Sequence, residues 1–178
     1  MKLFLDMDGV FADFDRRVVE LMHLRPSEMD DTQMWTFLST VPHLYKSFDL
    51  MSGAPAMWAA FCWLDPTFLT GVPLPRGQMK TAGMDKRIWI ATQFGDHVPV
   101  ITCASRDKAK YCSPGDVLVD DRDQYAHKWI EAGGIFMHHT PENPFYSVRC
   151  VLQLFKTAQE AEQPIEGGFM ISRKLKGE

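Results

Sequence analysis

The chain has 178 residues, 46% of them hydrophobic, which suffices for one well-filled core and is near the usual size of a single domain with a modest insertion. The formal net charge of -4, with acidic and basic residues interspersed, argues against a groove for long nucleic acid, although a small phosphate ester neutralised by a metal remains compatible with it. No apolar run reaches the roughly 18 residues of a membrane span, and a charged sixth residue would interrupt a signal peptide, so we expect a cytoplasmic protein without membrane contact.

The cysteines are widely spaced and form no CxxC pair; they are Cys62, Cys103, Cys112 and Cys150. This spacing argues against a zinc site and against a disulfide framework. We therefore expect reduced cysteines that are mostly buried as small hydrophobic side chains.

Short apolar runs alternate along the chain with segments of helical period. This alternation predicts an α/β fold with a doubly wound, Rossmann-like parallel sheet of five strands and crossover helices. The apolar runs occupy residues 2–6, 66–71, 98–103 and 116–121, with a weaker fifth at 133–139. Helical periodicity is found around residues 88–94, 125–130 and 148–155.

The segment from residue 13 to residue 61 breaks this alternation, because it contains helical patterns but no convincing strand. We interpret residues 13–61 as a helical cap inserted after the first strand. The core would then comprise residues 1–12 and 62–160. Residues 161–178 lose periodicity and are expected to form a peripheral tail.

The residues best suited to metal binding or catalysis stand at the ends of the apolar runs. In an open parallel sheet ligands bind beyond the carboxyl ends of the strands. An Asp-x-Asp pair such as Asp6 and Asp8 can be a simple turn or helix cap, but two adjacent charges are costly unless a cation binds them, and a second Asp pair follows the fourth run. We therefore expect a metal and phosphate site. The run ends are Asp6 and Asp8, Thr70 and Gly71, Arg106 and Lys108, and Asp120 and Asp121.

The stretch DMDGV at residues 6–10 resembles the first motif, DxDG[VT], of the haloacid dehalogenase superfamily of phosphatases. Within that superfamily, DMDGVFADFD, FLTGVP and SRDKAKYCSPGDVLVDDR resemble the 5'(3')-deoxyribonucleotidase family, and the similarity extends from residue 2 to about residue 138. The resemblance implies a Mg²⁺-dependent phosphomonoesterase that hydrolyses deoxyribonucleoside 5'- or 3'-monophosphates.

The resemblance also implies a role for each motif residue. Asp6 would attack phosphorus and form an aspartyl-phosphate, and Asp8 would be the general acid and base. Thr70 would hold a phosphoryl oxygen, and Lys108 would stabilise the transition state and pair with Asp6. Asp121 is favoured as the direct or water-shared ligand. The metal-binding set would be Asp6, Asp8 through its backbone carbonyl, Asp120 and Asp121.

Two positions leave alternatives open. The family usually has Ser after the motif-two Thr, whereas this chain has Gly71. The string RDK favours Lys108 as the motif-three lysine, but counting back from the Asp pair would select Lys110. Lys86 lies where the family tends to carry a helix lysine, and a solvent-facing role fits its sequence equally well.

The cap would recognise the part of the substrate that does not react. The resemblance places aromatic and apolar side chains around the base and sugar of a small-molecule nucleoside monophosphate, although helical aromatics also commonly pack as core. The cap aromatics could also form a homodimer contact. The predicted substrate-binding residues are Phe14, Met34, Trp35, Phe48, Gly71 and Arg106.

Two other functions remain open on the sequence. A related phosphatase could act on another small phosphate ester or on a polynucleotide 3' end, but the acidic net charge and the lack of a basic stripe disfavour the polynucleotide. A catalytically silent nucleotide-binding protein would not need both a nucleophile and an acid.

Overall fold

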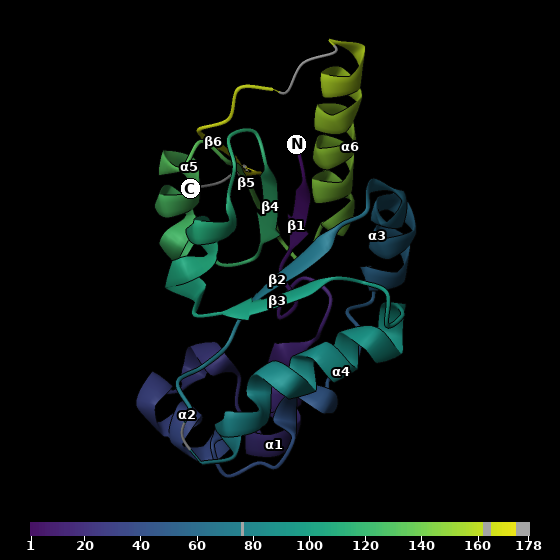
Figure 1. Ribbon diagram of the computed structural model, residues 1–178. Coiled ribbons are helices and arrows are strands. Elements are labelled where there is room, and N and C mark those ends of the chain that lie inside the picture. The colour runs from purple at the N-terminus through teal and green to yellow at the C-terminus, as the bar shows by residue number, and fades with distance from the viewer. Residues whose placement is uncertain (76, 162–164, 174–178) are drawn as a thin grey trace.

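The computed structural model describes residues 1–75, 77–161 and 165–173 and is built on a six-stranded sheet in the order β3-β2-β1-β4-β5-β6 (Figure 1). Every pair of neighbouring strands is parallel. The predicted α/β, doubly wound architecture is confirmed, with one strand more than expected. The strands are β1 (Leu3–Leu5), β2 (Thr67–Gly71), β3 (Val100–Cys103), β4 (Val117–Asp120), β5 (Ile135–His138) and β6 (Phe169–Ile171).

The sixth strand corrects the expectation that residues 161–178 form only a peripheral tail. β6 pairs in parallel with β5, with Phe169 opposite Ile135, and forms an edge of the sheet. The Gly168 N–H donates to the Gly134 carbonyl oxygen (2.9 Å), and the positive φ of Gly168 (90°) suits a residue without a side chain. A strand of three residues is too short to show a period of two, so the sequence pattern does not reveal it. Two parts of the predicted tail, residues 162–164 and 174–178, lie outside the described residues.

Helices connect the strands and cover both faces of the sheet. The α-helices are α1 (Phe14–Met22), α2 (Asp31–Leu38), α3 (Ala54–Phe61), α4 (Ala82–Phe94), α5 (Ala126–Glu131) and α6 (Pro144–Glu160). Short 3₁₀ turns are η1 (Pro26–Glu28), η2 (Leu44–Lys46), η3 (Cys62–Leu64), η4 (Gly77–Thr81), η5 (Ser105–Tyr111) and η6 (Asp123–Tyr125). Across the described ranges, we find no helix with the length and apolar character needed to cross a membrane.

The segment between β1 and β2 is helical, as expected for a cap inserted after the first strand. Asp13 and Asp30 start α1 and α2, because their carboxylates accept hydrogen bonds from the Arg16 N–H (3.0 Å) and the Gln33 N–H (3.1 Å). In Figure 1, α1 and α2 lie together beyond one end of the sheet, whereas α3 lies beside α6 and contacts it. The part of the insertion next to the strand ends is therefore α1, α2 and the turns that follow them.

Alternation along the strands divides the buried side chains between the two faces of the sheet. Leu3 and Leu5 of β1 point into the larger cluster, which also contains residues of α1, α3, α4 and α6. Phe4 points to the other face, where it packs edge-on against Trp129 of α5 (ring centroids 5.4 Å apart). Both faces of β1 are thus buried. This packing fixes the position of the strand, and with it the position of the residues that follow its carboxyl end.

The cysteines correct a second expectation. All of them are free, as predicted, but none is fully buried: Cys62 is exposed, and Cys103, Cys112 and Cys150 are partly exposed. The larger apolar side chains fill the core instead, because they remove more surface from water.

Candidate active site

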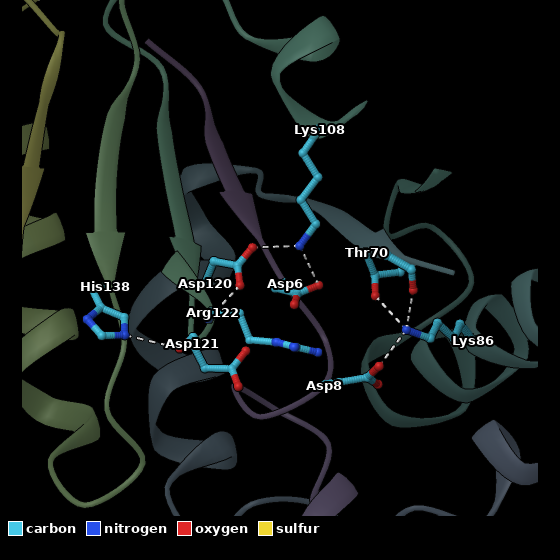
Figure 2. A network of polar contacts seen from close by, with 10 residues as sticks. Asp6, Asp8, Thr70, Lys86, Lys108, Asp120, Asp121, Arg122 and His138 are labelled. Carbon is cyan, nitrogen blue, oxygen red and sulfur yellow. Dashed lines mark hydrogen bonds and ion pairs between the residues drawn. The ribbon is translucent and has the colours of Figure 1, made fainter. Parts of the chain in front are cut away.

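Acidic and basic side chains from several strand ends meet at one edge of the sheet (Figure 2). Asp6 directly follows β1, and its backbone N–H donates to the Val119 carbonyl oxygen of β4 (2.9 Å). The last ladder bond of the β1/β4 pair thus places the Asp6 carboxylate beside the end of β4. Parallel strands bring their carboxyl ends to the same edge, as the sequence argument assumed.

A tight turn follows Asp6 and places Asp8. The Phe11 and Ala12 N–H groups both donate to the Met7 carbonyl oxygen (2.9 Å each), and Gly9 has a φ of +72°. A side chain at Gly9 would also collide with the carboxylate of Asp121. Glycine is therefore required here both for the backbone conformation and for the approach of the second Asp pair.

Lys108 of η5 binds two of the carboxylates. Its Nζ lies 2.9 Å from Asp6 Oδ1 and 2.7 Å from Asp120 Oδ2, and all three side chains are at most a tenth exposed. Burial by itself would lower the pKa of Lys108, but attraction to Asp6 and Asp120 outweighs it and raises that pKa, so the amine stays charged. Lys110 instead pairs with Asp107 (2.9 Å) and its side chain is 74% exposed, so of the two candidate lysines the structure places Lys108 in the site.

A second buried lysine holds Asp8. The Nζ of Lys86 in α4 donates to Asp8 Oδ2 (2.6 Å), to the Thr70 hydroxyl (3.0 Å) and to the Gly71 carbonyl oxygen. The side chain is 1% exposed, and its Nζ lies over the Tyr45 ring, 4.6 Å from the centroid. Of the two interpretations of Lys86, the solvent-facing one is wrong.

The helical period could have revealed this burial. Lys86 stands three and four residues before Trp89 and Ile90, and all three belong to the buried face of α4. A lysine at such a position needs an anionic or hydrogen-bonding partner, and the strand ends supply it.

The Asp8 carboxyl is set apart from the other carboxylates by its partner. Burial raises the pKa of Asp8, and the attraction of Lys86 offsets only part of this increase. A raised pKa favours the protonated acid, which suits a proton donor. The Thr70 hydroxyl lies beside the same lysine and is fully buried.

The two carboxylates of the second Asp pair differ in their hydrogen-bond partners. Asp120 uses both carboxylate oxygens within the protein: Oδ2 accepts from Lys108, and Oδ1 accepts from the Arg122 N–H (2.9 Å). The Asp121 side chain has a buried oxygen without a hydrogen-bond partner among the described residues. Burial, together with the charges of Asp6 and Asp120, raises the pKa of Asp121 to about 8. His138 ends a strand, but the sequence offers no spaced partner that would make it a metal ligand; its Nε2 lies 3.1 Å from the Asp121 carbonyl oxygen.

These carboxylates fit a divalent cation. Asp6, Asp120 and Asp121 each offer an oxygen, and the three oxygens lie within 4.8 Å of one another. Carboxylate oxygens are the ligands that Mg²⁺ prefers, and a cation would supply a partner for the orphaned oxygen of Asp121. Because Asp120 is already engaged, Asp6 and Asp121 are the side chains best placed to hold the ion. The carboxylate of Asp8 is turned to Lys86, which leaves its backbone carbonyl for the predicted contact.

A cavity of about 280 Å³ opens beside Asp6. Arg106, predicted to bind substrate, lines it, together with Asp6 and Lys108. Gly71 is not among the lining residues, and a side chain there would collide with the Ser105 hydroxyl, which favours glycine at this position.

The aromatic residues among the other predicted substrate-binding residues pack against one another in the inserted segment. The Phe14 ring lies 5.9 Å from that of Trp35 and 5.8 Å from that of Phe48, measured between centroids. Met34 and Phe48 are only 4% exposed and belong to the core. None of these side chains lines the cavity. The alternative interpretation, core packing, therefore describes Met34 and Phe48, while Phe14 and Trp35 keep partly exposed faces.

We compared the chain with known proteins. No protein-family model matches it, and no curated protein does. Among solved structures, a HAD hydrolase of family IA, variant 3, from Entamoeba histolytica is similar with a TM-score of 0.47 at 13% identity, over 96% of this chain and 92% of that chain. A HAD-superfamily hydrolase from Ehrlichia chaffeensis is similar with a TM-score of 0.52 at 15% identity, over 86% of this chain and 97% of that chain. The chain thus has the fold of a HAD-superfamily hydrolase, HAD denoting haloacid dehalogenase.

Proposed function

We propose that the protein is a Mg²⁺-dependent phosphatase of small phosphate monoesters that works through an aspartyl-phosphate. The observation that carries the proposal is that two carboxylates of the site are each held by a different buried lysine. Lys108 forms an ion pair with Asp6, the carboxylate placed to act as the nucleophile, while Asp8 sits apart in an environment that favours its protonated form.

In the first step a carboxylate oxygen of Asp6 forms a bond to phosphorus while the bond from phosphorus to the leaving oxygen breaks. Asp8 donates its proton to that oxygen, so the alcohol leaves neutral. In the second step water attacks the aspartyl-phosphate, Asp8 takes the water's proton, and Asp6 is regenerated together with inorganic phosphate. Bound Mg²⁺ would supply neutralisation of the phosphate charge, held by Asp6 and Asp121.

The lysines and Thr70 orient the reacting groups. Lys86 holds the Asp8 carboxyl by a 2.6 Å hydrogen bond, and Lys108 binds the Asp6 carboxylate from a different direction (Figure 2). Thr70 would donate to a phosphoryl oxygen once substrate is bound. Holding these groups in place before substrate arrives reduces the entropy lost in reaching the transition state.

For the substrate, the resemblance of the motifs favours a deoxyribonucleoside 5'- or 3'-monophosphate. The partly exposed rings of Phe14 and Trp35 support this choice, because a base could stack on them. A second candidate is another small phosphate ester, and it is favoured by the cavity beside Asp6, whose lining lacks the cap aromatics.

Phosphate release from a panel of esters tests the proposal. We expect release from deoxyribonucleoside monophosphates with Mg²⁺ and none with EDTA, and we expect Asp6→Asn to lower kcat by roughly 1,000-fold or more. Asp96→Asn, a matched change at an exposed carboxylate, should leave kcat unchanged. Release only from sugar phosphates would keep the Asp6 chemistry and select the second candidate, whereas equal turnover by Asp6→Asn and wild type would exclude the covalent mechanism.

A further inference from the structure

The cavity beside Asp6 is lined by more cations than the proposed chemistry uses. Besides Lys108, its basic lining residues are Arg106, Arg122 and Lys128. Among the described residues, none of these three forms an ion pair. Lys128 is placed by the Tyr125 ring, with its Nζ 5.5 Å from the centroid.

The charges of the lining do not cancel. Asp6 and Asp120 are its only carboxylates in the described chain, and Lys108 lies between them. Bound Mg²⁺ would neutralise the rest of the negative charge at the sheet edge. Three cations that form no ion pair within the described ranges then line a small cavity, in a chain whose net charge is -4. Such a local excess of arginine and lysine is typical of a site for an anion.

Arg122 connects this cavity with the reacting groups. Its backbone N–H is bound to Asp120, and in Figure 2 its side chain points from the end of β4 toward the space between Asp6 and Asp8. Its charge also acts on the cap: burial raises the pKa of Asp15 in α1, and Arg122 opposes that increase. Arg122 thus belongs to the cavity lining and also borders the second Asp pair.

We propose that the substrate carries a second anionic group on its leaving group, and that Arg106, Arg122 and Lys128 bind that group. This inference rests on the proposed phosphatase function and narrows its substrate class to esters such as sugar or nucleoside bisphosphates. The cavity of about 280 Å³ is at the small end of ligand pockets, which span roughly 300 to 1,000 Å³, so it suits a leaving group of one sugar or one nucleoside and excludes an oligonucleotide. Tyr125 and the exposed Leu74 offer contacts to its apolar part.

Matched pairs of esters provide the test. We would measure kcat/KM with Mg²⁺ for thymidine 3',5'-bisphosphate against thymidine 5'-monophosphate, and for fructose 1,6-bisphosphate against fructose 6-phosphate. The bisphosphate should be preferred by roughly tenfold or more in at least one pair, since each charged hydrogen bond contributes about tenfold. Arg122→Gln and Lys128→Gln should each reduce that preference about five- to tenfold. The exposed Lys110→Gln is the matched control and should leave it unchanged.

A binding measurement separates recognition from turnover. Asp6→Asn should bind the preferred bisphosphate about tenfold more tightly than its monophosphate in calorimetry, and adding Arg122→Gln should remove most of the difference. Hydrolysis of monophosphates with no bisphosphate preference in either pair would overturn the inference and leave the phosphatase intact. Absence of hydrolysis for every ester, with Mg²⁺ present, would overturn the proposed function and this inference with it.

Discussion

The two sides of the candidate site are built from similar parts but differ in what surrounds them. Each side has a buried lysine bound to a carboxylate, namely Lys86 with the partly exposed Asp8 toward α4 and the cap, and Lys108 with the buried Asp6 toward η5 and α5. On the cap side, Lys86 lies under the Tyr45 ring within packed aromatic side chains. On the α5 side, Lys108 borders an open cavity lined by further cations.

This difference indicates a separation of tasks. In our proposal, the packed side positions the general acid and sets its protonation, because burial raises the pKa of Asp8 and Lys86 opposes that increase. In our proposal, the open side receives the part of the substrate that distinguishes one ester from another. Residues outside the aromatic cap can thus also contribute to substrate specificity. Variants on the two sides should therefore lose different properties, such as kcat, the pH dependence of activity or stability.

The largest effect is expected on the open side, from Lys108→Met. This change leaves Asp6 and Asp120 facing each other without the amine between them. We expect kcat to fall by roughly 1,000-fold, and the free energy of unfolding in EDTA to fall by about 3 kcal/mol, since an unpaired buried charge remains. Enzyme assays and urea denaturation measure the two effects. Lys110→Met is the control, and a Lys108→Met variant within tenfold of wild-type kcat would contradict the role of Lys108.

A smaller effect with a distinct signature is expected on the packed side, from Lys86→Met. Without the amine, the pKa of Asp8 should rise further, because Lys86 is the main influence that lowers it. A higher pKa keeps Asp8 protonated to higher pH, so the alkaline limb of the kcat/KM profile should move to higher pH, while kcat falls about 10- to 100-fold. A loss of activity with an unmoved alkaline limb would show that Lys86 acts only through folding.

The smallest effect on catalysis is expected in the cap core, from Phe48→Ala. The Phe48 ring packs edge-on against both Phe14 and Tyr45, and its exposed fraction is 4%. Truncation should lower the free energy of unfolding by about 3 kcal/mol, while KM for thymidine 5'-monophosphate changes less than about threefold. Phe37→Ala, at a ring that is 40% exposed in α2, is the matched control. A selective rise of KM for nucleotides without loss of stability would contradict the core role and show that Phe48 contacts the base of the substrate.

Residues at strand ends were the most predictable part of the molecule. Asp6 and the pair Asp120 and Asp121 follow apolar runs directly, and parallel pairing of those strands brings them together without any knowledge of the loops. The choice of Lys108 over Lys110 came from a local string, and the structure places the chosen lysine in the site.

Residues whose position depends on tertiary packing were less predictable. Lys86 is buried because α4 turns its buried face to the strand ends. The helical period places Lys86 on that face, but a charged residue is usually expected to face solvent. Arg122 and Lys128 join Arg106 in the cavity lining only because α5 packs beside η5, and no spacing in the sequence reports that approach. The short β6 similarly depends on pairing with β5.

Trapping of the covalent intermediate would test the central claim most directly. The enzyme would be quenched in acid during turnover of a phosphate-labelled monoester with Mg²⁺, digested, and searched for labelled peptides. The mechanism predicts label on the peptide that contains Asp6 in the wild type and none in Asp6→Asn. Rapid steady turnover with no label on that peptide, or label and turnover retained by Asp6→Asn, would contradict it.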